Sequence, residues 1–237
     1  MALIPQNFLF HMRFPTLRAP QKTARLAAEA LDERYSIPFW SQYAAPDGID
    51  KRLSEPGVLR LRNPEIANRF DFRVAWAPDG LTFTFVLRGK KSQPSWTRAA
   101  LKYADCVRIC LDARDLKDAR RAGKFCHKFL FYPFVGESRD SETSLAQWVP
   151  INRAKASPNA VDVADFKMNA ERRVDGYAFS IFIPGSSITG YDVEEFNRVG
   201  LHYAARDSQY GAFVLQYADP TPVEDDPSLW ASFIFRD

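Results

Sequence analysis

Basic and sulfur-containing side chains recur at alternate positions in two segments of the chain. Residues 105–112 read DCVRICLD and residues 125–133 read FCHKFLFYP, so that Arg108 and Lys128 each stand among apolar neighbours. A guanidinium can hold an oxyanion through two hydrogen bonds, and a lysine adds a compact positive charge. If these strands are neighbours in one sheet, the pattern predicts a groove that binds a carboxylate, a sulfate or a phosphate.

The period-two alternation indicates pleated strands with one buried face. We expect Val107, Ile109 and Leu111 to face the core, which sends Cys106, Arg108 and Cys110 to the opposite face. The same rule places further basic residues away from the core: Lys128, His202, Arg206, Arg88 and Arg73. The alternative is that these cations lie on two separate surfaces, or pair as solvated charges with Asp71, Asp105, Asp112 and Asp207.

The cysteines and histidines are better interpreted as buried side chains than as ligands of a metal ion. Cys106 and Cys110 are four residues apart on a strand, or about 13 Å, whereas a zinc ion needs each sulfur at about 2.3 Å. Cys126 could approach one of them across strands, but inert thiols are the expectation. His127 shares the core-facing register of Phe129 and is predicted to be a core histidine. No metal ligand is therefore assigned.

Catalytic chemistry has little support in the sequence. The acidic residues Asp192, Glu194, Glu195, Asp225 and Asp226 lie in predicted loops, where surface or capping roles are common. There is no serine nucleophile elbow, no phosphate-binding loop and no HExxH pattern. We therefore predict no catalytic residue and no cofactor. The alternative left open is calcium at Asp112, Asp115 and Asp118, although these lack the spacing of an EF-hand.

The elements that would position these residues are short strands separated by turns. Residues 70–76 and 81–87 alternate around Pro78-Asp79-Gly80 and predict a hairpin. Further candidate strands are 107–111, 125–131, 177–183, 199–205, 211–217 and 231–235, with weaker ones at 147–151 and 161–166. The connection 113–124 is expected to include a helical turn. About ten strands predict an all-β fold, a two-sheet antiparallel β-sandwich of jelly-roll type.

The first third of the chain reads differently. Residues 7–14 predict an opening strand, residues 23–34 a short helix, and residues 44–64 carry proline, glycine and asparagine turn signals. We expect one domain over residues 1–237, in which residues 1–65 form a loop-rich extension packed on residues 66–237. Trp76, Trp148 and Trp230 are expected to be core or corner residues.

Composition limits the partners. The 237 residues are 46% hydrophobic and include 19 Phe, which is ample for a core. The 32 basic and 29 acidic residues leave a net charge of +3, too balanced to indicate nucleic acid or an anionic membrane. No stretch approaches the roughly 20 apolar residues of a membrane span, and residues 1–10 lack the features of a secretory signal. With three cysteines, a soluble cytoplasmic protein is the expectation.

Five local signatures together resemble the family 9 carbohydrate-binding modules and the wider DOMON-like sandwich group. They occur in the family's order and cover roughly residues 66–237. The similar segments are Asp79-Gly80-Leu81, Trp96 ahead of residues 105–109, Gly176-Tyr177 leading to Ile183-Pro184, residues 199–207, and Asp226-Pro227-Ser228-Leu229-Trp230. The resemblance implies a β-sandwich.

The resemblance also implies where a sugar would bind. Members that bind sugar clamp a terminal unit between two aromatic faces, while polar side chains read its hydroxyls. Trp96 is close to the first clamp position, and the second falls near Glu224, which is not aromatic. Arg108 replaces the family's acidic sugar reader, and Lys128 replaces its glutamine. The sandwich thus carries over more fully than the sugar site does.

The leading prediction is a non-catalytic binding domain for a carbohydrate, an acidic or sulfated saccharide, or another small anion. Trp96 would stack on the ligand, and the donors would be Arg108, Lys128, His202, Arg206 and Arg88. The first alternative is a structural or protein-interaction domain whose candidate face is covered by residues 1–65 or by a partner. A haem carrier using His127, His202 or Met168, as in some DOMON-like relatives, or a glycan-processing enzyme comes third. The oligomeric state stays open.

Overall fold

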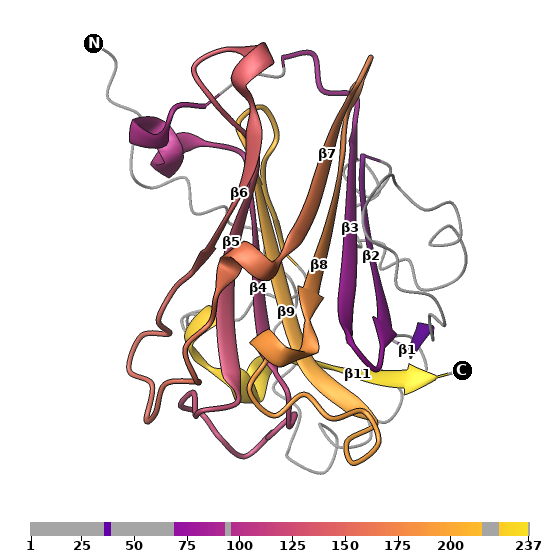
Figure 1. Ribbon diagram of the computed structural model, residues 1–237, viewed down its shortest axis with the longest axis vertical. Helices are drawn as coiled ribbons and strands as arrows, with labels where there is room; N and C mark the ends of the chain where they lie inside the picture. The colour runs from indigo at the N-terminus through magenta and orange to yellow at the C-terminus, as the bar shows by residue number, and fades with distance from the viewer. Residues whose placement is uncertain (1–35, 39–68, 93–95, 215–222, 237) are drawn as a thin grey trace, which may run out of the picture.

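The computed structural model describes residues 36–38, 69–92, 96–214 and 223–236 (Figure 1). The predicted opening strand at 7–14, the helix at 23–34 and the turn-rich segment 44–64 lie outside the described residues, so the N-terminal extension stays a prediction. No helix within the described ranges has the length and apolar character that a bilayer span requires.

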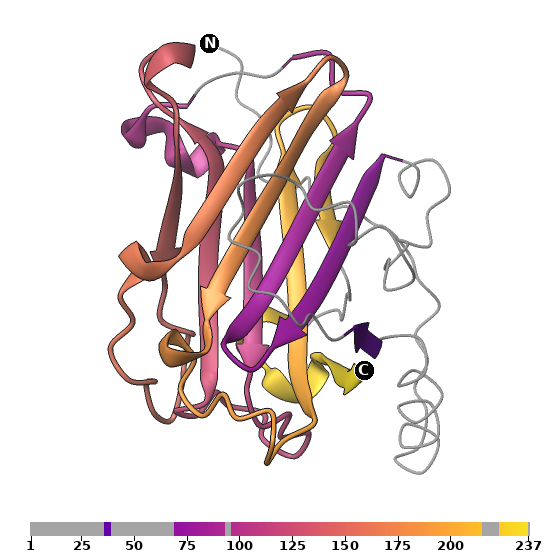
Figure 2. The same ribbon diagram turned by 45° about the vertical axis from the view of Figure 1, so that its right-hand side comes forward.

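Two β-sheets face each other across one core (Figures 1 and 2). The larger sheet has the order β1-β11-β9-β4-β5-β6, with β10 also paired to β9. Its strands are β1 (Ser36–Pro38), β4 (Cys106–Asp112), β5 (Cys126–Val135), β6 (Thr143–Trp148), β9 (Arg198–Asp207), β10 (Gly211–Val214) and β11 (Ala231–Arg236). The smaller sheet has the order β2-β3-β8-β7, formed by β2 (Phe70–Ala77), β3 (Gly80–Arg88), β7 (Lys167–Arg173) and β8 (Gly176–Pro184).

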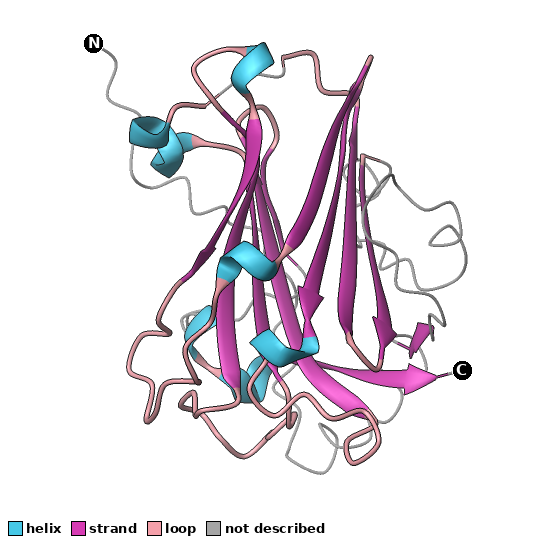
Figure 3. Cartoon of the chain, viewed as in Figure 1, coloured by secondary structure: helices cyan, strands magenta, loops and turns pink. Residues whose placement is uncertain are grey.

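Strand pairing confirms the predicted antiparallel sandwich. Every described pair is antiparallel except β1 with β11, which is parallel. Single-turn and two-turn 3-10 helices occupy connections between strands (Figure 3). They are η2 (Arg98–Tyr103), η3 (Arg139–Ser141), η4 (Val163–Asp165), η5 (Gly185–Ser187), η6 (Val223–Asp225) and η7 (Pro227–Leu229).

Aromatic side chains from both sheets fill the space between them. Phe72 of β2 stacks on Tyr203 of β9 with ring centroids 4.0 Å apart, so the two sheets meet through these rings. Val107, Ile109 and Leu111 are buried in the same cluster, which confirms the predicted register of β4. The core therefore fixes which residues of β4, β5 and β9 point to the opposite face.

Two local predictions are wrong. Residues 161–166 do not form a strand but lead through η4 into β7, whose mostly polar residues escaped recognition. Among the described strands β7 pairs with β8 alone, so it is an edge strand and needs little apolar character. Residues 113–124 contain turns rather than a helical turn. Asp112 ends its strand by accepting hydrogen bonds from the backbone N of Arg114 at 3.0 Å and of Leu116 at 2.8 Å.

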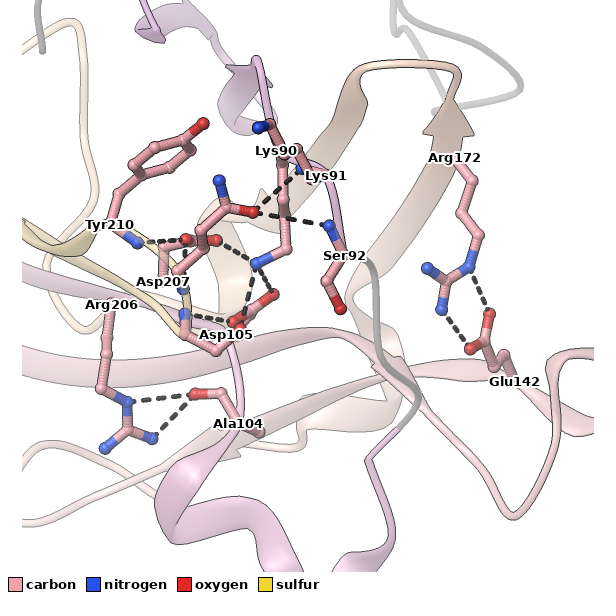
Figure 4. Close-up of polar contacts among 12 residues, drawn as sticks. Lys90, Lys91, Ser92, Ala104, Asp105, Glu142, Arg172, Arg206, Asp207 and Tyr210 are labelled. Atoms are coloured by element: carbon pink, nitrogen blue, oxygen red, sulfur yellow. Dashed lines mark hydrogen bonds and ion pairs between the residues drawn. The ribbon is translucent and has the colours of Figure 1, made fainter.

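A buried ion cluster joins the sheets at one end, where the sequence suggested solvated charges. The side chain of Lys90, just after β3, has no exposed surface. Its Nζ lies 2.9 Å from Oδ2 of Asp105 and 2.5 Å from Oδ2 of Asp207, at the ends of β4 and β9 (Figure 4). Asp105, Asp112 and Asp207 are all buried, so treating them as ordinary solvated charges is incorrect.

The polypeptide around Lys90 directs this lysine inward. Gly89 has φ +73°, a left-handed conformation that favours glycine. Tyr210 donates a hydrogen bond from its hydroxyl to the carbonyl of Gly89. Asp207 in turn accepts hydrogen bonds from the backbone N of Gln209 and Tyr210, both at 2.8 Å. The turn after β9 and the end of β3 are therefore one hydrogen-bonded unit.

A second connection between the sheets lies at the same end of the sandwich, at the edge that β6 and β7 form. Arg172 of β7 donates to Glu142 beside β6 through Nε at 3.0 Å and through Nη2 (Figure 4). The same guanidinium lies 4.1 Å from the ring centroid of Phe134. Charged residues thus connect the two sheets at two positions of this end of the sandwich.

Candidate functional site

The outer face of the larger sheet, the face opposite the core, carries the residues that the sequence singled out. Strand register places Arg108 of β4 opposite Leu130 of β5 and Ala204 of β9. The next row along the sheet contains Lys128, Cys110 and His202. The predicted alternation is therefore confirmed, and β4, β5 and β9 are neighbours as the groove required.

The two predicted cations meet at a carboxylate of the same chain. Nη1 of Arg108 lies 2.7 Å from Oε1 of Glu224, and Nζ of Lys128 lies 2.8 Å from Oε2. Asp225 stands 3.9 Å from the same lysine. We call Arg108, Lys128, His202, Glu224 and Asp225 the outer-face cluster. Its cations converge as predicted, but the groove that they form is already occupied by Glu224.

Electrostatics keep Glu224 ionised. Burial of this carboxyl favours its neutral form, but Arg108 and Lys128 outweigh burial and hold its pKa below the ordinary value. The side chains of Arg108, Lys128 and Glu224 are 33%, 16% and 20% exposed, so solvent still reaches the cluster. A ligand could therefore contact these charged groups without unfolding the sheet.

A short C-terminal turn delivers Glu224 to the sheet. Trp230 is 2% exposed and donates from Nε1 to the carbonyl of Val223 at 2.7 Å. Val223 and Trp230 pack with Cys110 and Cys126 against the outer face. Asp226 caps the following turn by accepting from the backbone N of Ser228 at 3.1 Å. These contacts hold η6 and η7 against the sheet independently of the Glu224 carboxylate.

Trp96 borders the same face on the β5 side. It forms a parallel β-bridge with Val135 and packs, partly buried, against a cluster that includes Cys106 and Tyr132. Leu130 is a partly buried member of that cluster and sits beside Arg108 in the register. Trp96 and Leu130 therefore border the same apolar cluster on the outer face, and Leu130 is the residue of this group that lies beside Arg108.

Two other predicted donors have different positions. Arg206 lies on the same face, opposite Cys106, but its guanidinium donates to the carbonyls of Ala104 and Leu101 at 2.9–3.1 Å (Figure 4). Arg88 belongs to the smaller sheet and pairs with Asp71 at 2.6 Å. The structure does not bring Arg88 together with the outer-face cluster, because β3 lies in the opposite layer.

His202 is the most buried of the outer-face cluster's Arg108, Lys128, His202 and Glu224, at 2% exposed. Its burial, together with Arg108 and Lys128, lowers its pKa to about 4 even though Glu224 acts in the opposite direction. Its Nδ1 has no hydrogen-bond partner among the described residues. His202 is therefore neutral near pH 7 and does not add to the positive charge, contrary to the sequence-based assignment of a cationic donor.

This buried histidine predicts acid sensitivity. An unfolded chain binds a proton at His202 below pH 6.5, whereas the folded protein resists until about pH 4. The unfolded state therefore holds more protons in this window, and stability falls as the pH falls. Between pH 7 and pH 5 we expect the wild-type protein to lose about 2 kcal/mol more unfolding free energy than His202→Asn. Urea unfolding at both pH values tests this, and equal losses in the two proteins would contradict it.

The described part of the chain does not bring the candidate metal ligands together. No group of three His, Cys, Asp or Glu side chains is placed there to hold a metal ion. Cys106, Cys110 and Cys126 are buried free thiols. His127 accepts a hydrogen bond at Nε2 from the backbone N of Thr189 at 2.9 Å, on the core side of the sheet that separates it from His202.

The acidic loop considered for calcium is bound to other partners. The carboxylate of Asp115 lies 2.5 Å from Nζ of Lys117 and accepts from the hydroxyl of Ser232 at 2.6 Å. Asp112 receives the two backbone N–H groups described above, and Asp118 is exposed. These contacts position a turn between β4 and β5.

Sequence reasoning missed the role of Glu224 and Asp225. The sequence analysis places Asp225 among the loop acids and, through the resemblance, Glu224 near a clamp position, but it assigns neither of them a cationic partner. The alternation rule locates cations on a strand but contains no information about a loop more than 90 residues later in the chain. The signal available was the charge opposition itself: two cations on one face require a nearby anion when they are partly buried.

Comparison with known proteins agrees with the architecture. No protein-family model matches the sequence, and the search of curated proteins found no match. Among solved structures, a family 9 carbohydrate-binding module from Caldicellulosiruptor kristjanssonii in complex with cellotriose has a TM-score of 0.57 and 14% identity, covering 86% of this chain and 93% of that chain. Another structure of such a module from that organism, in complex with glucose, has a TM-score of 0.52 and 14% identity, covering 85% and 94%. The chain has the fold of these modules.

Proposed function

We propose that this protein is a non-catalytic carbohydrate-binding domain whose ligand lies against Trp96 on the outer face of the larger sheet. The observation that carries the proposal is that Trp96 and Leu130 pack against one apolar cluster on that face, and that Leu130 lies beside the charged Arg108. Modules with the same fold are known in complex with cellotriose and with glucose.

The residue types suit a sugar. A pyranose has an apolar C–H surface and a polar rim, so it combines with an aromatic ring and a few placed polar groups. Trp96 supplies the ring, and Leu130 extends the apolar surface towards β4. Arg108 and Lys128 supply N–H donors, and Glu224 supplies carboxylate acceptors. A hydroxyl group can donate to one and accept from the other.

The charge of the saccharide is the finer question. Arg108 and Lys128 on adjacent strands favour an acidic or sulfated sugar, which remains the second candidate. Glu224 and Asp225 supply two opposing negative charges within 4 Å of these cations. Because the positive charge is compensated inside the cluster, we place neutral saccharides first.

The ionisation of Glu224 favours a binding role over hydrolysis. Glycosidases use two carboxyl groups, one of which has a raised pKa and donates a proton. In Glu224 the pKa is instead held below its ordinary value by Arg108 and Lys128, in spite of burial. Asp225 shares the same lysine and is 3.4 Å from the amide nitrogen of Asn152. These carboxylates are equipped to accept hydrogen bonds rather than to transfer protons.

Calorimetric titration of the full chain with cellotriose, glucose and glucuronate tests the proposal. We expect saturable heat with at least one neutral saccharide, and weaker binding of glucuronate than of glucose, because its carboxylate meets Glu224 and Asp225. If no saccharide, neutral or acidic, produces saturable heat up to millimolar concentration, the carbohydrate proposal fails. A protein-interaction domain would then become the leading interpretation.

A further inference from the structure

The Glu224 side chain occupies the outer-face cluster in the way that an external acid would. One carboxylate oxygen faces Arg108 at 2.7 Å and the other faces Lys128 at 2.8 Å. Charge-assisted contacts at such distances are the ones by which proteins hold carboxylate and sulfate ligands. The two cations come from adjacent strands, whose paired backbones fix their separation.

The carboxylate is replaceable without loss of the turn that carries it. Val223 is buried, and its carbonyl accepts the indole N–H of Trp230. Lys117 donates to the carbonyl of Trp230 at 2.5 Å, which ties the end of this turn to the loop after β4. None of these contacts involves the Glu224 side chain, so rotation or neutralisation of that side chain leaves η6 in place.

The cluster also retains unused hydrogen-bonding capacity. Nε of Arg108 is buried without a hydrogen-bond partner in the described part of the chain, and so is Nδ1 of His202. His202 is 2% exposed and stands one strand away from Cys110 in the row of Lys128. Buried polar atoms normally find partners, so these two mark the cluster as a place where a ligand would add contacts.

We propose that Arg108 and Lys128 form a binding subsite for a carboxylate or sulfate group, which Glu224 keeps closed as a built-in competitor. A ligand that carries such a group binds there only by displacing the Glu224 carboxylate from both cations. The subsite deepens the proposed function, because it sets the preference between acidic and neutral saccharides. It does not depend on that function, since a free anion would occupy the same two cations.

The charges of the cluster indicate how replacing Glu224 should change the affinity for an anion. The two positive charges of Arg108 and Lys128 are balanced by Glu224 and Asp225. Glu224→Gln keeps the size of the side chain and removes one negative charge, so the cluster becomes net positive and Nη1 of Arg108 loses its ionic partner. We expect the affinity for glucuronate to rise about tenfold and its ratio to glucose affinity to rise by at least as much, a change of about 1.4 kcal/mol.

Titration with three ligands distinguishes binding of a free anion from binding of an acidic or a neutral sugar. Wild-type protein and Glu224→Gln are titrated with sulfate, glucuronate and glucose at low ionic strength, where screening is weak. Glu194→Gln is the matched control, because Glu194 is exposed and the same charge is removed away from the cluster. Arg108→Gln combined with Glu224→Gln is expected to lose the gain. Circular dichroism and thermal unfolding establish that each variant is folded.

The outcomes separate this proposal from the proposed function. A folded Glu224→Gln protein that binds sulfate or glucuronate no better than wild type or Glu194→Gln overturns the closed subsite, even if glucose binds normally. A gain with sulfate that the Arg108 substitution abolishes supports the subsite, even if no variant binds any saccharide, neutral or acidic. In that case the carbohydrate proposal fails alone.

Discussion

Replacing Lys90 by methionine is expected to lower the free energy of unfolding by about 3–5 kcal/mol. The lysine is fully buried between Asp105 and Asp207, whose side chains are 3% and 2% exposed. Methionine has a similar length but no charge, so two carboxylates would remain in the interior facing each other without a cation. Leaving a buried charge uncompensated costs far more than the ion pair itself contributes.

The expected loss should be visible in thermal and urea unfolding. For a domain of this size, it corresponds to a lower melting temperature by roughly 10 °C. Lys91→Met is the matched control: Lys91 is the exposed neighbour, and its recorded contact with Gln209 is through the backbone N. We expect less than about 0.5 kcal/mol from that surface change.

A second substitution tests the cause. Asp207→Asn added to Lys90→Met removes one of the two stranded charges, so the double variant is expected to be more stable than Lys90→Met alone. If Lys90→Met unfolds like the wild-type protein, or if Lys91→Met is equally damaging, the buried ion cluster does not connect the sheets as we describe.

Replacing Trp96 by alanine is expected to weaken saccharide binding by about 30- to 100-fold, or roughly 2–3 kcal/mol. Trp96 provides the aromatic surface of the proposed site, and it is partly exposed beside Leu130. Truncation removes the stacking surface and leaves the polar groups in place. Hydrogen bonds to sugar hydroxyls replace bonds to water and contribute little alone.

Calorimetry with cellotriose measures this loss, and Trp96→Phe separates the aromatic ring from mere bulk. Phenylalanine keeps an aromatic surface, so we expect it to retain binding within about tenfold of the wild-type affinity. Thermal unfolding controls for loss of packing against Cys106 and Tyr132. A folded Trp96→Ala protein with wild-type affinity would show that the ligand does not contact this face.

Local pattern was sufficient for most of the sandwich. Alternation in 105–112 gave the correct core face of β4, because Val107, Ile109 and Leu111 can be buried together only in one register. The Pro78-Asp79-Gly80 turn likewise placed the hairpin of β2 and β3, in which Ala77 pairs with Gly80. β7 escaped because an edge strand with polar side chains carries no periodic apolar signal.

The strand residues of the candidate site could be predicted from the sequence, but their partners could not. Alternation placed Arg108 and Lys128 on one face, and the resemblance indicated Trp96, but each interacts with a segment distant in sequence. Lys90 pairs with Asp207 across 117 positions, and Arg108 meets an acid on η6. The local sequence around Lys90 does not predict its burial, because the carboxylates that permit burial belong to residues at the ends of other strands.

Chemical shifts of the indole N–H groups during a cellotriose titration show whether the ligand contacts Trp96. The chain has five tryptophans, and the resonance of Trp96 is assigned by its disappearance in Trp96→Phe. We expect the Trp96 signal to move progressively and to saturate, while the signal of Trp230, which is buried at the end of η7, stays in place. Saturable binding without a shift of Trp96, or with the main shift at another indole, would contradict this expectation.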